Sequence, residues 1–93
     1  MKNIRANLIV TGRVQGVCFR METRRAAKRV GNLSGWVKNL PDGTVAAVLE
    51  GNESDVNKMI EWCHKGPAEA SVTDVKVEWA SYSGNFDSFD INY

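Results

Sequence analysis

The sequence has few of the residues on which many enzymes rely for acid–base and metal chemistry. Its 93 residues include one histidine, His64, and two cysteines, Cys18 and Cys63. A single histidine excludes motifs that need two histidine ligands, and two distant cysteines indicate neither a zinc site nor a disulfide framework. His64 falls near the end of an expected helix, where the dipole favours a proton, and we expect it on the surface.

The chain also lacks long apolar runs and a surplus of either charge. No segment reaches the roughly 20 apolar residues of a membrane-spanning helix, and the opening residues have no stretch of signal-peptide length. Lys and Arg number 12 against 11 Asp and Glu, whereas a nucleic-acid-binding surface usually shows a clustered basic excess. We therefore expect a cytoplasmic protein without membrane or nucleic-acid partners. Because 43% of the residues are hydrophobic, residues 1–93 can build one core and form a single domain.

Apolar spacing predicts the order of the secondary structure. Alternation predicts strands over residues 4–11, 35–39, 44–49, 72–80 and 87–93, and helical spacing predicts helices over 19–30 and from about 54 to 65. Gly31 is suited to end the first helix, Asn52 or Ser54 to cap the second, and Pro41-Asp42-Gly43 to turn between two strands. The order β-α-β-β-α-β plus a C-terminal strand predicts an α+β, ferredoxin-like two-layer sandwich. Two helices then cover one face of a mainly antiparallel sheet, a fold that hosts many functions.

Residues 12–20, Gly-Arg-Val-Gln-Gly-Val-Cys-Phe-Arg, join the first strand to the first helix and have the character of an anion-binding loop. They contain no carboxylate and end at a helix N-terminus, where free N–H groups and the dipole favour a phosphate. A cation such as Arg20 in the first turn costs about 0.3–1 kcal/mol unless a negative group lies near it. Either a bound anion or an ion pair with Glu22 would remove that cost. The residues alone leave phosphate binding and an ordinary glycine-containing turn equally open.

Two residues near this loop are further candidates for chemistry. Cys18 could be a nucleophile, but cysteine phosphatases use a Cys-x5-Arg loop, and Arg20 follows too closely, so a small packed side chain is favoured. Asn39 ends a strand before the hairpin turn, where asparagine often caps a turn. If the first two strands are parallel neighbours, Asn39 lies near the 12–20 loop, and its amide can orient a water. Cys63 falls on an apolar helix stripe and is expected in the core; a pairing of the two thiols stays open.

A binding module is the second hypothesis from the residues. Ferredoxin-like sheets can stack single-stranded RNA on exposed aromatic side chains, and four are available: Trp36, Trp79, Tyr82 and Phe89. However, the chain contains no RNP1-like run and its net charge is near zero.

Residues 12–20 and 35–39 together resemble the acylphosphatase family. The first segment matches Gly-x-Val-Gln-Gly-Val-x-Phe-Arg at every defined position, and Gly-Trp-Val-Lys-Asn matches the family's second block. The ending Phe-Asp-Ile-Asn-Tyr resembles its C-terminal strand, whereas Leu40 departs from the threonine of some members. An acylphosphatase-like domain of a larger carbamoyl-transfer enzyme is an alternative, against which the length of the chain argues.

The resemblance implies a hydrolase that cleaves acyl phosphates, which are acid anhydrides, into carboxylate and inorganic phosphate. It assigns catalysis to Arg20, which would bind phosphoryl oxygens, and to Asn39, which would orient the attacking water. It assigns the phosphate cradle to the backbone amides of Gln15, Gly16, Val17, Cys18, Phe19 and Arg20. It implies a monomer with a small substrate, and neither metal nor cofactor. The small number of acid–base residues is compatible with this reaction. The leaving carboxylate has a conjugate-acid pKa of about 4–5 and therefore leaves without a proton donor. The physiological acyl phosphate is not readable from the sequence.

Overall fold

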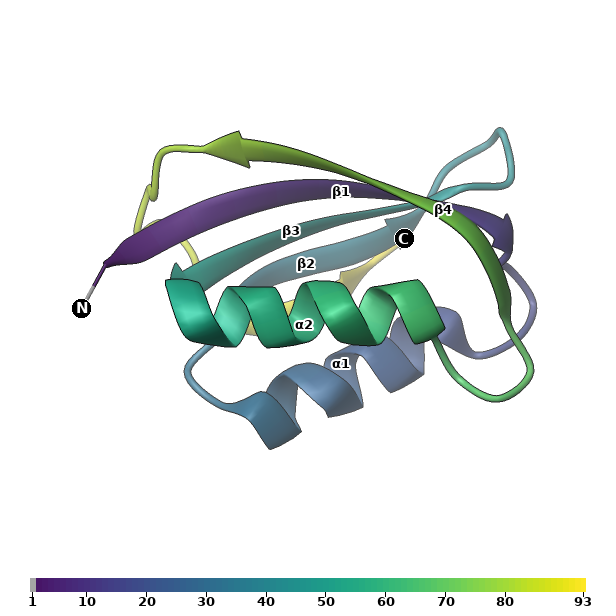
Figure 1. Cartoon of the computed structure of the whole chain (residues 1–93), viewed down its shortest axis with the longest axis horizontal. Coiled ribbons are helices and arrows are strands. Elements are labelled where there is room, and N and C mark those ends of the chain that lie inside the picture. The colour runs from purple at the N-terminus through teal and green to yellow at the C-terminus, as the bar shows by residue number, and fades with distance from the viewer. Residues whose placement is uncertain (1) are drawn as a thin grey trace.

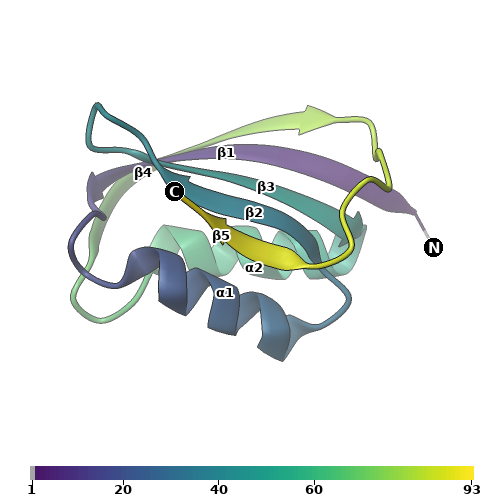
Figure 2. The same cartoon turned by 180° about the vertical axis from the view of Figure 1, so that it is seen from behind.

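The computed structural model describes residues 2–93, which form a sheet layer and a helix layer. The elements are β1 (Asn3–Arg13), α1 (Phe19–Val30), β2 (Ser34–Asn39), β3 (Val45–Asn52), α2 (Glu53–Lys65), β4 (Ser71–Ala80) and β5 (Phe89–Asn92). The strand order is β4-β1-β3-β2-β5, and every described pair is antiparallel except the parallel β2–β5 pair. Both helices cover the same face of the sheet (Figures 1 and 2). The ferredoxin-like α+β sandwich predicted from the sequence is confirmed.

Local signals set where the elements begin and end. The Gly31 N–H donates to the Ala27 carbonyl over 2.9 Å and closes α1. The Asn52 side chain accepts a 2.9 Å hydrogen bond from the Ser54 N–H, so Asn52, not Ser54, caps α2. In the β2–β3 turn, the Asp42 carboxylate accepts from the N–H and hydroxyl of Thr44. These bonds are local in the sequence, which is why residue type predicted the helix end at Gly31 and the turn at 41–43 and left two candidates for the α2 cap.

The strands β1 and β2 are not neighbours, which corrects the arrangement considered for Asn39. The strand β3 lies between them and is antiparallel to both, so β1 and β2 run parallel to each other and end at the same edge of the sheet. Residues 45–51 of β3 are all buried. A strand buried on both faces suits the middle of a sheet. The strand β3 has this position, with β1 on one side and β2 on the other.

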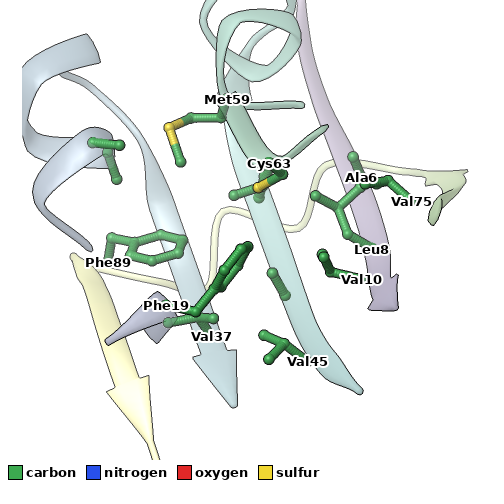
Figure 3. Packing of buried hydrophobic residues seen from close by; sticks show 14 of the residues in the cluster. Ala6, Leu8, Val10, Phe19, Val37, Val45, Met59, Cys63, Val75 and Phe89 are labelled. Carbon is green, nitrogen blue, oxygen red and sulfur yellow. The ribbon is translucent and has the colours of Figure 1, made fainter. Parts of the chain in front are cut away.

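The core between the layers also fixes the start of α1. Leu8 and Val37 from the sheet meet Met59 and Cys63 of α2, and Phe19 projects among them from the first position of α1 (Figure 3). The Phe19 ring is 2% exposed, and its centroid lies 5.6 Å from that of Trp62. Because its first residue is packed in the core, the N-terminus of α1 has a defined position against the sheet.

A buried carboxylate, which the sequence did not predict, organises the opposite face of the sheet. Glu50 of β3 is 0% exposed and accepts hydrogen bonds from the Ser83 N–H (3.0 Å), the Ser83 hydroxyl (2.8 Å) and the Gly84 N–H (3.1 Å). Its carboxylate also lies 3.4 Å from the Arg5 guanidinium. Burial is the largest single influence and raises the pKa of Glu50, but these hydrogen bonds and the Arg5 charge together hold the pKa below its ordinary value of 4.5. Glu50 thereby holds the connection between β4 and β5 against the sheet.

Candidate active site

The loop between β1 and α1 is held by backbone geometry and by its neighbours. Gly16 has a φ of 74°, which favours glycine, and Cys18 adopts the left-handed conformation at φ 60°. Gly12 has a different reason to be glycine, because a Cβ there would collide with the Ser71 carbonyl where β1 and β4 shift register. The two glycines singled out in the sequence therefore have separate roles, one in the loop and one in the sheet.

The Gln15 side chain ties this loop to the β2–β3 hairpin. Its amide nitrogen donates to the Leu40 carbonyl over 2.7 Å and to the Thr44 carbonyl over 2.9 Å. Both acceptors flank the turn that follows Asn39, so Gln15 sets the distance between the loop and the end of β2. Leu40 contributes to this tether through its backbone, which does not depend on the identity of its side chain.

The N-terminus of α1 has no side-chain cap. Cys18 stands at the cap position without a capping hydrogen bond, and the first helical bond runs from the Glu22 N–H to the Cys18 carbonyl over 3.0 Å. The N–H groups of Phe19, Arg20 and Met21 therefore precede the intrahelical ladder. Such groups, together with the positive end of the helix dipole, suit an anion.

Arg20 is half-buried beside these N–H groups, and no carboxylate in the described part of the chain pairs with it. Glu22, the candidate partner in the sequence, forms its ion pair with Arg25 over 3.0 Å instead. The Arg20 guanidinium lies over the ring of Tyr93, with 4.9 Å between its central carbon and the ring centroid. A cation–π contact does not use the N–H groups of the guanidinium in conventional hydrogen bonds, so these groups remain available to a ligand.

Asn39 ends β2 at the same edge of the sheet. Within residues 2–93, its Oδ1 is the one buried side-chain oxygen or nitrogen without a hydrogen-bond partner. A buried polar atom left without a partner costs about 1–3 kcal/mol, and natural proteins retain few such atoms. The position marks Asn39 as a candidate functional residue.

One cavity of about 330 Å³ joins most of the residues singled out in the sequence. It is lined by Val14, Gly16, Cys18, Phe19, Arg20, Met21, Asn39, Ile91 and Tyr93. The side chains of Gln15 and Val17 do not line it, because one binds the hairpin and the other is buried. The lining residues that the sequence did not predict are Val14, Met21, Ile91 and Tyr93, although the alternation in the C-terminal strand placed Ile91 and Tyr93 on one face.

The remaining candidate residues lie as follows. Cys63 is buried, and burial raises the pKa of its thiol to about 12, whereas Cys18 is exposed; both thiols are free. His64 is exposed at the end of α2, as expected. Phe89 is only 7% exposed and faces the helices, which removes it from the aromatic surface that the RNA-binding hypothesis needs.

No three His, Cys, Asp or Glu side chains in residues 2–93 gather as a metal-binding cluster. In the same range, no helix has the length and apolar character needed to span a membrane.

Solved structures place this sandwich in the class of ferredoxin-like α+β hydrolases. The crystal structure of acylphosphatase from Bacillus subtilis superposes with a TM-score of 0.91 at 36% identity, covering 97% of this chain and 99% of that one. The acylphosphatase of Geotalea uraniireducens is 52% identical over 90 residues, which cover 97% and 98% of the two chains. Residues 6–91 match the acylphosphatase family model. The chain therefore belongs to the acylphosphatase family, whose activity is the hydrolysis of acyl phosphates, a class of acid anhydride.

The same fold also occurs as a small part of a larger protein. Full-length HypF, in a phosphate- and nucleotide-bound form, superposes with a TM-score of 0.88 at 25% identity, covering 99% of this chain but 12% of that one. The chain spans nearly the full length of the acylphosphatases above, in contrast to its small share of HypF.

Proposed function

We propose that the 12–20 loop, the start of α1 and Asn39 form the active site for acyl phosphate hydrolysis. One observation carries the proposal: Arg20 has no carboxylate partner and shares a cavity with the buried, unpartnered Oδ1 of Asn39. The guanidinium of Arg20 binds two phosphoryl oxygens, for which its planar fork is suited. The backbone N–H groups of residues 15–20 complete the phosphate cradle at the uncapped helix start.

Asn39 orients the attacking water through its Oδ1. The water oxygen forms a bond to phosphorus while the bond from phosphorus to the acyl oxygen breaks, and the carboxylate leaves with the electron pair. A proton of the water passes to a phosphoryl oxygen, so the products are carboxylate and inorganic phosphate. Arg20 and the N–H groups stabilise the charge on the phosphoryl oxygens in the transition state.

This mechanism uses neither a metal ion nor a covalent enzyme intermediate. The guanidinium and the aligned N–H groups supply the positive field, and the leaving carboxylate needs no general acid. Cys18 lies at the cavity, but the cavity lining contains no histidine, aspartate or glutamate that could take the proton of its thiol. We also propose that residues 1–93 act as one domain, as a cytoplasmic monomer with a small-molecule substrate; the free thiols fit a reducing compartment.

Hydrolysis in ¹⁸O-labelled water tests the direction of attack. Attack on phosphorus places the label in inorganic phosphate, whereas attack on the carbonyl carbon places it in the carboxylate. Unlabelled phosphate, incubated with the enzyme in the same water, controls for exchange after the reaction. The rate should be the same with and without excess chelator. Label in the carboxylate, or a chelator-sensitive rate, would contradict the mechanism.

A further inference from the structure

The cavity of the proposed active site is lined by both polar and apolar side chains. Arg20 and Asn39 are among the polar ones, and Met21 and Tyr93 are among the large apolar ones. Met21 is 51% exposed and Tyr93 is 90% exposed, and they are two of the four large hydrophobic residues that residues 2–93 expose. Exposed apolar side chains that gather at one cavity, unlike scattered ones, indicate a binding surface.

The fold places both apolar side chains next to the catalytic candidates. Met21 directly follows Arg20 in the first turn of α1. The parallel β2–β5 pairing matches Lys38 with Asn92, so Tyr93 follows β5 at the level at which Asn39 ends β2. The Tyr93 ring is also in contact with the Arg20 guanidinium, at 4.9 Å. The start of α1 and the residue after β5 therefore line the same cavity, although they lie far apart in the sequence.

The contact between Arg20 and Tyr93 bears on where the two parts of a substrate can lie. The guanidinium carbon lies over the Tyr93 ring, and in the proposed function the guanidinium N–H groups bind the phosphoryl oxygens together with the N–H groups at the N-terminus of α1. The acyl group is joined to that phosphoryl group through one oxygen. It therefore lies within reach of the exposed part of the Tyr93 ring and of the Met21 thioether.

We propose that Tyr93 and Met21 form the acyl-binding part of the site and select aromatic acyl groups over small aliphatic ones. This inference rests on the proposed function, because it takes the phosphoryl group to be bound at Arg20. An aromatic acyl group gains ring–ring contact with Tyr93 and sulfur–aromatic contact with Met21, which an acetyl group lacks. Tyr93 is a specificity-determining residue on this account, beyond any positioning of Arg20.

Kinetics with two substrates distinguish a role of Tyr93 in acyl-group specificity from a role in positioning Arg20. We would measure kcat/KM for benzoyl phosphate and acetyl phosphate, and the inhibition constant of inorganic phosphate, in the wild type and four variants: Tyr93→Ala, Tyr93→Phe, Met21→Ala and the control Tyr82→Ala. The inhibition constant of inorganic phosphate reports on phosphate binding at Arg20 alone, because inorganic phosphate has no acyl group. Tyr82 is a suitable control because it is 44% exposed and does not line this cavity.

The preference for benzoyl over acetyl phosphate should fall about tenfold in Tyr93→Ala and about threefold in Met21→Ala, as expected for loss of one aromatic or sulfur–aromatic contact. Tyr93→Phe keeps the ring and should keep the preference, and Tyr82→Ala should match the wild type. The inhibition constant of phosphate should change little in each variant.

Equal losses with both substrates, together with weaker phosphate inhibition, would show that Tyr93 acts only by positioning Arg20 and would overturn the inference. An unchanged preference in both Tyr93→Ala and Met21→Ala would overturn it as well. Arg20→Ala, measured separately with the same two substrates, distinguishes failure of the proposed function, because near-normal hydrolysis of both would contradict that function and not the acyl specificity alone.

Discussion

The two helices of this protein begin in opposite ways. The α2 start is satisfied by its own chain: Asn52 caps it, the Glu53 N–H donates to the Lys2 carbonyl over 3.0 Å, and Glu53 and Asp55 complement the dipole. The α1 start has no side-chain cap, and its first turn carries the cation Arg20 as well as Glu22, whose carboxylate pairs with Arg25. A helix start that meets its own needs contributes to stability, whereas one that leaves N–H groups and a cation available is prepared for an anion.

The buried carboxylate of Glu50 and the buried side-chain oxygen of Asn39 show a similar contrast. Glu50 accepts hydrogen bonds from Ser83 and Gly84 and pairs with Arg5. Asn39 Oδ1 is buried without a partner. The first arrangement holds a connection of the fold in place, and the second fits a group whose partner arrives with the substrate.

The largest expected effect is that of Arg20→Ala. We expect kcat/KM for an acyl phosphate to fall about 10³-fold, because charge stabilisation in the transition state is lost. The free energy of unfolding should change little, since no carboxylate in the described residues depends on Arg20. Steady-state kinetics and urea unfolding measure the two quantities.

The matched control for this variant is at the other helix start. Asn52→Ala removes the α2 cap and should lower the free energy of unfolding by about 1 kcal/mol while leaving kcat/KM unchanged. A near-normal rate in Arg20→Ala, or a loss of activity in folded Asn52→Ala, would contradict the assignment of the α1 start to substrate binding and of the α2 start to stability.

The next effect is that of Asn39→Ala. We expect kcat to fall about 10²-fold with KM nearly constant, because the side chain aligns water rather than gripping substrate. Stability should be unchanged or slightly higher, since the variant loses no hydrogen bond of Oδ1 and removes an unsatisfied buried atom. Asn57→Ala on the exposed surface of α2 is the control. A rise in KM at constant kcat would assign Asn39 to binding instead.

The smallest effect on activity is that of Glu50→Gln, which should leave kcat/KM intact and lower the free energy of unfolding by about 2 kcal/mol at neutral pH. The folded-state pKa of Glu50 lies below 4.5. Its contribution is therefore complete above that value and is lost as the pH falls through the lower folded-state pKa. The difference between wild type and variant should shrink as urea unfolding is repeated from pH 7 down to about pH 3. A difference independent of pH would rule out the carboxylate charge as its cause.

Much of the molecule followed from short-range patterns. The helix over 19–30 and the turn at 41–43 depend on spacing and residue type within a few positions, so the sequence alone predicted them, and it narrowed the α2 cap to Asn52 or Ser54. The same holds for the 12–20 loop, whose residues and place before a helix carried both the anion-binding hypothesis and the family resemblance.

What the sequence by itself determined was the set of elements and the loop with Arg20 at its end. Only the tertiary structure decided that β3 separates β1 from β2, that Gln15 ties the loop to the hairpin, and that Tyr93 stacks on Arg20. These contacts join residues far apart along the chain. Strand pairing and packing choose such partners by burial and register, and neither leaves a local pattern from which a single sequence reveals the pair.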